Sequence, residues 1–153
     1  MQEDWVEQLL EISRVKHNTY SSTCEEVLQE ITHLLASSSK SIDADTLCKE
    51  FCTREEIEST YLNHGVAIPH IRSTQVKKPV GALIKLNKGL CFCKTNNDLV
   101  DIFFGFIVPH ADNDLHLRIL AGIAEKFNSA DFRKSLRHTM SNQELFTTAI
   151  TKI

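Results

Sequence analysis

The chain has 153 residues, of which 42% are hydrophobic and 24% are charged, a balance typical of one globular domain with a substantial core. Its 17 basic and 20 acidic residues give a formal net charge of −3. The chain therefore lacks the basic excess of a nucleic-acid-binding protein, and we expect no nucleic-acid partner. No apolar stretch approaches the roughly 18 residues that span a bilayer, and the acidic N-terminus lacks a signal-peptide pattern, so we expect a cytoplasmic protein with no direct membrane insertion.

Two helices are predicted near the N-terminus. Apolar side chains recur at helical spacing and predict an opening helix over residues 4–15. The segment 22–25, Ser-Thr-Cys-Glu, is a capping-box pattern that precedes a second apolar series. We therefore expect a second helix that begins at this cap and ends near Ala36, ahead of a run of serines.

The next part of the chain is also predicted to be helical. A helix should begin near Asp43 and bury Leu47 and Phe51, which lie on one helical face. The segment 53–56, Thr-Arg-Glu-Glu, offers a further capping pattern and predicts a separate short helix. Arg54 would then lie in the first turn of that short helix.

Strands are predicted for the middle of the chain. The run 66–68, Val-Ala-Ile, reads as a short buried strand. The segments 80–86 and 90–93 flank an Asn-Lys-Gly turn signal and are expected to form a hairpin. Another turn is expected at 96–98, Asn-Asn-Asp, and the almost wholly apolar run 100–108 should be a strand buried on both faces.

The C-terminal third predicts three more helices. Asp112 or Asn113 should cap the first, Ser129 a shorter one, and the segment 141–144 the last. Helices before and after a group of strands predict an α/β fold whose sheet is covered on both faces. Because no internal repeat or linker is visible, we expect residues 1–153 to form a single domain, in which 1–20 is the least clearly assigned segment.

His70 is the most informative residue of the chain. It closes the run Gly65-Val66-Ala67-Ile68-Pro69-His70. Pro69 has a fixed φ and no N–H, so it should end the strand abruptly, while Gly65 permits a tight approach at the other end. We therefore expect an imidazole projecting from the rim of a short strand, where neutral histidine is a competent nucleophile near pH 7.

The run 65–70 resembles the phosphohistidine motif of the fructose/mannitol type of enzyme IIA in the bacterial sugar phosphotransferase system. Upstream, 54–56 and 59–60 fit the family's Arg-Glu and Ser-Thr positions, and downstream His116 resembles its second histidine at the start of a helix. The resemblance extends from about Tyr20 to the C-terminus. It implies a three-layer α/β sandwich with a mixed β-sheet flanked by helices on both faces, and no bound cofactor.

The resemblance also implies roles for individual residues. His70 would accept a phosphoryl group on Nε2 from an HPr-like phosphocarrier protein, which requires its other ring nitrogen to be held by a hydrogen bond. Arg54 and His116 would support the phosphoryl group, since guanidinium matches phosphate geometry and a neutral imidazole at a helix start can donate a hydrogen bond. Ser59 and Thr60 are weaker candidates for hydroxyl hydrogen bonds to phosphate.

Two versions of this function are open. In the nitrogen-regulatory branch, which the run 100–109 also resembles and which we favour, the phosphorylation state signals to a regulated target protein. In sugar transport, a free-standing fructose/mannitol-type IIA passes the phosphoryl group to a IIB cysteine. The chain departs from common family members at Ile71-Arg72, where small residues often follow the histidine, and this departure leaves the choice of partner open.

Two alternatives lie outside phosphoryl transfer. One is a non-catalytic binding module that keeps the same fold. The other is a transition-metal site built from His64, His70, His110 and His116. Because these histidines lack helical i, i+4 spacing and an accompanying carboxylate motif, and the five cysteines lack CxxC pairs, we expect no metal site.

Overall fold

A six-stranded mixed sheet forms the centre of the computed structural model, which describes residues 3–92 and 98–151. The sheet order is β1-β5-β6-β3-β2, and β4 also pairs with β6. The strands are β1 Val15–Thr19, β2 Tyr61–Asn63, β3 Val66–Ala67, β4 His70–Ser73, β5 Val80–Cys91 and β6 Leu99–Pro109. β5 and β6 pair in antiparallel fashion, whereas β1 pairs with β5, and β3 and β4 with β6, in parallel.

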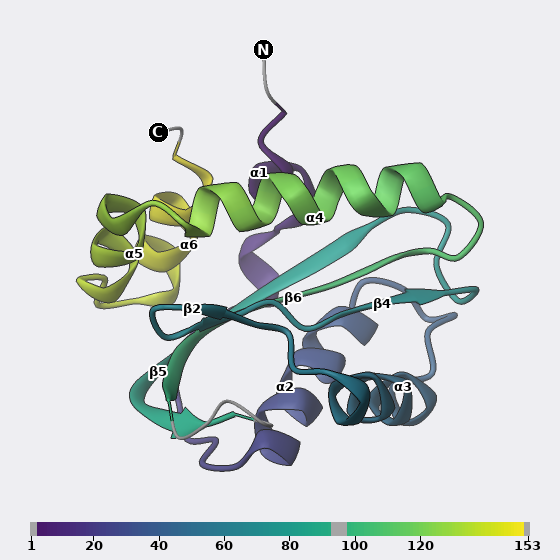
Figure 1. Cartoon of the computed structure of the whole chain (residues 1–153), viewed down its shortest axis with the longest axis horizontal. Coiled ribbons are helices and arrows are strands. Elements are labelled where there is room, and N and C mark those ends of the chain that lie inside the picture. Colours follow the sequence, from purple (N-terminus) through teal and green to yellow (C-terminus); the bar gives the residue numbers. More distant parts are fainter. Residues whose placement is uncertain (1–2, 93–97, 152–153) are drawn as a thin grey trace.

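Helices cover both faces of this sheet (Figure 1). The helices are α1 Trp5–Leu9, α2 Cys24–Ala36, α3 Ala44–Ile57, α4 Asn113–Phe127, α5 Ala130–Arg137 and α6 Asn142–Ile150, with a 3-10 turn, η1, at Ile12–Arg14. β6 feeds both layers because its side chains alternate: Phe103 belongs to the apolar cluster under α2 and α3, whereas Phe104 and Phe106 belong to the cluster under α1, α4, α5 and α6. The predicted three-layer α/β sandwich is confirmed.

Most of the predicted helix starts are also confirmed, although the cap of α2 lies one residue later than the pattern at 22–25 predicts. Thr23 accepts a hydrogen bond from the backbone N–H of Glu26 at the start of α2, which ends at Ala36 as expected. The Asp112 carboxylate caps α4, and Ser129 and Ser141 cap α5 and α6. Within residues 3–92 and 98–151, each helix is too short or too polar to cross a bilayer.

The predicted opening helix over residues 4–15 is wrong in its extent. α1 ends at Leu9, and Val15 begins strand β1, where it pairs with Leu83 of β5. The Arg14 guanidinium explains the break, since it donates to the carbonyl of Leu9 at 3.0 Å and to that of Gly81 at 2.9 Å. Tertiary pairing of a β-branched residue therefore outweighs the local helical periodicity.

The predicted break before Arg54 is also wrong. α3 continues without interruption to Ile57, so Arg54 lies in its last turn rather than in the first turn of a new helix. There its guanidinium Nη1 donates to the carbonyl of Glu58 at 2.7 Å. A cation that satisfies a free carbonyl at the C-terminal end of a helix stabilises that end.

The hairpin predicted within residues 80–93 does not form. β5 runs through the Asn-Lys-Gly segment to Cys91, with a register shift between Lys85 and Leu90, and pairs with β6 instead. Residue 93 and most of the predicted turn at 96–98 lie outside the described residues. The long antiparallel β5–β6 pair explains the difference, because its ladder continues on both sides of the bulge.

Candidate functional site

His70 begins a strand of its own. β3 ends at Ala67, Ile68 and Pro69 interrupt the strand, and β4 starts at His70, which pairs with Phe106 of β6. The strand therefore stops at the proline as expected, but the chain rejoins the sheet at once. The turn before β3 has φ values of 54° at His64 and 81° at Gly65, and the second is a conformation that glycine adopts without strain.

The His70 ring is held in one orientation by two contacts. Nδ1 lies 2.7 Å from the carbonyl oxygen of Ile68, so this nitrogen carries the proton and donates it. One ring face stacks on Phe106, with ring centroids 5.0 Å apart and an interplanar angle of 10°. Because Nδ1–H is engaged, the neutral ring carries its lone pair on Nε2.

A chain of hydrogen bonds links this ring to α3. The Ile68 N–H donates to the carbonyl of Thr60 at 3.1 Å. Thr60 in turn donates its backbone N–H (2.9 Å) and its hydroxyl to the carboxylate of Glu55, which is 1% exposed. Burial raises the pKa of Glu55, whereas the hydrogen bonds from Thr60 lower it. The buried carboxylate thus positions the backbone that orients His70.

His116 lies beside His70, in the first turns of α4. The two ring centroids are 5.4 Å apart and the rings are tilted by 51°. Nε2 of His116 is buried and has no hydrogen-bond partner within the described residues. An unpaired buried polar atom is costly unless a ligand satisfies it, so this nitrogen is available to a group bound next to His70.

Both histidines line a pocket of about 610 Å³ between α3 and the start of α4. Cationic and imidazole side chains dominate its lining: Lys49, Arg54, Arg72, His70, His110 and His116. The carboxylate of Glu50 is the acidic group among the described lining residues. In Figure 1, β4 lies at the right, with α3 below it and the start of α4 above it. The pocket can therefore attract an anion to the free nitrogen of His70.

Electrostatics keep both rings neutral near pH 7. Burial lowers the pKa of His70 to about 4; the hydrogen bond to Ile68 opposes this shift, and Arg54 and His116 add to it. Burial likewise lowers the pKa of His116, and the charges of Arg72 and Arg54 lower it further. A neutral His70 keeps the lone pair that nucleophilic attack requires.

The weaker candidates lie outside the pocket. The hydroxyl of Ser59 accepts from the N–H of Tyr61 at 3.2 Å, and Thr60 donates to Glu55. Neither residue belongs to the described lining of the pocket.

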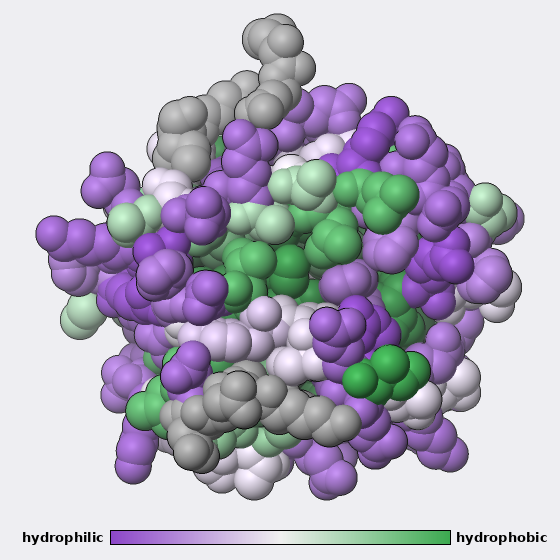
Figure 2. Space-filling view, viewed as in Figure 1, coloured by the Kyte–Doolittle hydropathy of each residue, from purple (hydrophilic) through white to green (hydrophobic). Residues whose placement is uncertain are grey.

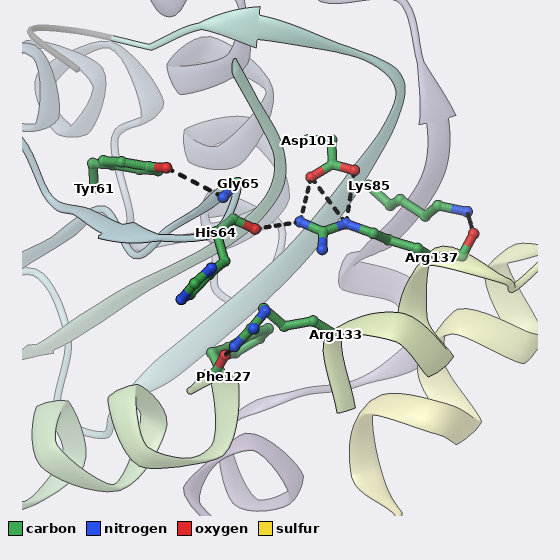
Figure 3. Close-up of polar contacts among 8 residues, drawn as sticks. All are labelled: Tyr61, His64, Gly65, Lys85, Asp101, Phe127, Arg133 and Arg137. Carbon is green, nitrogen blue, oxygen red and sulfur yellow. Dashed lines mark hydrogen bonds and ion pairs between the residues drawn. The ribbon is translucent and has the colours of Figure 1, made fainter. Parts of the chain in front are cut away.

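A separate polar network surrounds the turn before β3. The carbonyl of His64 accepts from Arg137 at 2.6 Å, and Arg137 forms an ion pair with Asp101. Figure 3 shows this network, which is separate from the pocket.

The four histidines considered as metal ligands do not converge. His64 lines a different cavity from His70, His110 and His116. Across the described part of the chain, three or more His, Cys, Asp or Glu side chains do not gather in a group suited to a metal ion.

Sequence reasoning missed two cations of this pocket as site residues. Lys49 lines the pocket from the same helix as Arg54, but the separate helix predicted at 53–56 hid that relation. Arg72 lies two residues after His70 on β4, so strand alternation places both side chains on one face of the strand. That period-2 relation was the available signal, yet it could not be used while His70 was expected to end a strand.

Comparisons with known proteins identify a family and several relatives. Residues 8–151 match the family described as phosphoenolpyruvate-dependent sugar phosphotransferase system, EIIA 2. A nitrogen regulatory protein from Pseudomonas aeruginosa is 31% identical over 141 residues, which is 92% of this chain and 92% of that protein.

Two solved structures share the fold. The nitrogen regulatory protein IIA-Ntr from Neisseria meningitidis has a TM-score of 0.85 at 28% identity, covering 94% of this chain and 98% of that one. A complex of mannitol enzyme IIA with phosphorylated enzyme IIB from Escherichia coli has a TM-score of 0.76 at 17% identity, covering 92% of this chain and 96% of that one. At that identity the second likeness concerns the fold alone.

Proposed function

Because this chain belongs to the EIIA 2 family of the phosphoenolpyruvate-dependent sugar phosphotransferase system, we propose that it carries a phosphoryl group on Nε2 of His70. One observation supports this assignment above the others: the Ile68 carbonyl engages Nδ1 at 2.7 Å, which leaves Nε2 as the basic nitrogen. The surrounding pocket is cationic and the ring is neutral at pH 7, as a nucleophile that meets an anionic group requires.

The proposed reaction is a transfer between two histidines. The lone pair of Nε2 attacks the phosphorus of a phosphohistidine on an HPr-like donor protein, and the donor's N–P bond breaks as the new one forms. The electron pair of the broken bond returns to the donor ring. The Nδ1 proton of His70 stays in its hydrogen bond to Ile68, so no base is required.

Arg54 and His116 support the transferred group in this proposal. The guanidinium of Arg54 balances the charge of the phosphoryl oxygens, and the unpaired Nε2 of His116 supplies a hydrogen bond to one of them. Preorganised donors of this kind contribute about 3 kcal/mol each to transfer rates. Thr60 acts through Glu55 and the backbone rather than on the phosphate, and Ser59 has a local structural role.

We place the protein in a regulatory circuit. The Pseudomonas aeruginosa and Neisseria meningitidis relatives are nitrogen regulatory proteins, and a phosphoryl group would largely neutralise the positive charge of the pocket, a change that a partner can detect. A regulated target protein is thus the partner we favour. Transfer to a IIB domain is the alternative, supported by the fold shared with the mannitol enzyme IIA–IIB complex.

Donor-dependent phosphorylation tests the carrier function. The protein is incubated with enzyme I, an HPr-like donor and phosphoenolpyruvate, and intact mass is measured before and after mild acid. We expect one acid-labile phosphoryl group, absent in His70→Gln and retained in His64→Gln. No mass gain with any donor would favour the non-catalytic binding module instead.

A second experiment separates regulation from transport. Phosphorylated protein and the His70→Gln variant are compared as baits against candidate partners. Capture of a target that depends on phosphorylation state, without transfer to it, supports regulation. Transfer of the phosphoryl group to a IIB cysteine would contradict the regulatory assignment.

A further inference from the structure

Arg72 places a second guanidinium in the pocket of His70. Residues 70 and 72 are two apart on β4, with buried Ile71 between them. Because side chains alternate along a strand, those of His70 and Arg72 leave it on the same side. Both side chains line the same cavity. The position of Arg72 therefore follows from the strand that also positions His70, and does not depend on a mobile loop.

A neutral residue anchors this guanidinium. Nη1 of Arg72 donates to the amide oxygen of Asn113 at 3.1 Å, in the first turn of α4. Arg54 is held in a similar way, by the carbonyl of Glu58. Within the described chain neither arginine forms an ion pair with a carboxylate. Both positive charges thus remain available to an anion in the pocket.

The two arginines belong to different elements and have different anchors. Arg54 comes from the last turn of α3, whereas Arg72 is tied to the start of α4, one turn before His116. The charge of Arg72 acts on His116, and that of Arg54 acts on both His70 and His116. A group bound to Nε2 of His70 would therefore share the pocket with both guanidinium groups.

We infer that Arg72 is a second phosphate-binding residue, which together with Arg54 clamps the phosphoryl group of phospho-His70 and the group in transfer. This inference rests on the proposed function for the identity of the anion. Guanidinium binds two phosphate oxygens in a planar fork, which a lysine at the same place cannot reproduce. Asn113 acts as a positioning residue, because it orients Arg72 without touching the phosphate.

Two readouts test the clamp, and one of them needs no donor protein. The first is the maximal single-turnover rate of phosphorylation at saturating donor. The second is the affinity of the unphosphorylated protein for inorganic phosphate, followed by NMR of the His70 and His116 rings. The variants are Arg72→Gln, Arg72→Lys and Lys78→Gln, an exposed residue outside the pocket lining whose substitution removes the same charge.

We expect Arg72→Gln to lower the maximal rate and the phosphate affinity by roughly tenfold each, Arg72→Lys to recover part of both, and Lys78→Gln to change neither beyond twofold. As a single substitution, Asn113→Ala should lower the rate. In an Arg72→Gln background it should have no further effect. If Arg72→Gln behaves like Lys78→Gln in both readouts, or only weakens apparent donor affinity, the clamp is refuted.

The outcomes remain distinct from failure of the proposed function. If the wild-type protein accepts no phosphoryl group from any donor, the carrier function fails, and the inorganic phosphate titration alone decides whether Arg72 binds phosphate. If Arg72→Gln fails to fold, the comparison of Arg72→Lys with wild type decides it in the same two readouts.

Discussion

At the scale of single residues, the hydrogen bond between Nδ1 of His70 and the Ile68 carbonyl determines which ring nitrogen keeps its lone pair. It selects the tautomer, and burial together with nearby Arg54 prevents protonation. The proline before His70 is a local signal that predicted this residue as the nucleophile, whereas the family resemblance predicted Arg54 and His116 as its neighbours. All three line one pocket, and their roles stay predictions. The sequence could not predict that Ile68 supplies the carbonyl partner. The position of Ile68 depends on a backbone hydrogen bond to Thr60, eight residues earlier in the chain.

The His70 ring should titrate far below ordinary histidines. The unfolded chain takes up this proton near pH 6.5 and the folded protein near pH 4, so folding stability falls as the pH drops through this window. The shift corresponds to about 3 kcal/mol. NMR titration should show a neutral ring with a protonated Nδ1 down to about pH 5. Urea unfolding of His70→Gln should lack this component, and protonation of His70 near pH 6.5 would contradict the account.

The Thr60 hydroxyl should matter for stability more than for phosphate binding. Thr60→Val leaves the buried Glu55 carboxylate without one of its donors, which should cost about 1–3 kcal/mol of unfolding free energy. The exposed Thr74→Val is the control and should change the stability by less than about 0.5 kcal/mol. Slower transfer by Thr60→Val with unchanged stability would instead show that the hydroxyl contacts the phosphate.

At the scale of elements, the turn at His64 and Gly65 aligns β3 with β6. Gly65 accepts from the backbone N–H groups of Asp101 and Ile102 through its carbonyl, and Arg137 of α5 holds the neighbouring carbonyl of His64. Figure 3 shows how Asp101 fixes that arginine. Arg137 of α5 thus holds the turn at His64 and Gly65, which leads through β3 to His70.

Gly65→Ala should disturb this alignment. A Cβ there would lie 2.6 Å from the Arg137 Nη2 and 3.0 Å from the Asp101 Oδ1, at a φ of +81°. We expect a loss of about 1–3 kcal/mol of unfolding free energy, measured by urea denaturation. Gly89→Ala, without a positive φ, should lose less. Equal stability of Gly65→Ala and wild type would show that this turn does not constrain β3.

Capping signals and apolar periodicity predicted α2, α4, α5 and α6 well, because these depend on neighbours in sequence. The same local rules failed at α1 and at residues 53–56. At Val15 a strand pairing won over helical spacing, and at Thr53 a capping pattern occurred inside a continuous helix. The second error hid the fact that Lys49 and Arg54 belong to one helix and line one pocket.

At the scale of the whole molecule, the candidate site lies at β4, between α3 of one helical layer and the start of α4 of the other. We propose that residues 1–153 act as one domain, since α1 packs its buried Val6 and Leu9 into the apolar cluster that also contains Ile119 and Ile123 of α4. Figure 2 shows hydrophilic side chains around a central apolar area on the face seen in Figure 1. Exposed Ile57 lines the pocket, and exposed Leu117 directly follows the pocket residue His116 in α4.

Leu117 should contribute to donor docking. It is 56% exposed and follows His116 directly, so Leu117→Glu should raise the apparent KM for the donor by roughly tenfold while the maximal rate stays the same. Met140→Glu, at a residue 79% exposed between α5 and α6, is the control and should leave both values unchanged. Steady-state phosphorylation kinetics decide between them, and identical KM values for the two variants would exclude Leu117 from docking.

The position of the phosphoryl group tests the central claim most directly. Nitrogen-15 NMR of the phosphorylated protein, with the histidine rings assigned, distinguishes substitution at Nδ1 from substitution at Nε2. We expect phosphorus on Nε2 of His70 and a proton retained on Nδ1, still donated to Ile68. Phosphorus on Nδ1, or on any other histidine, would contradict the account.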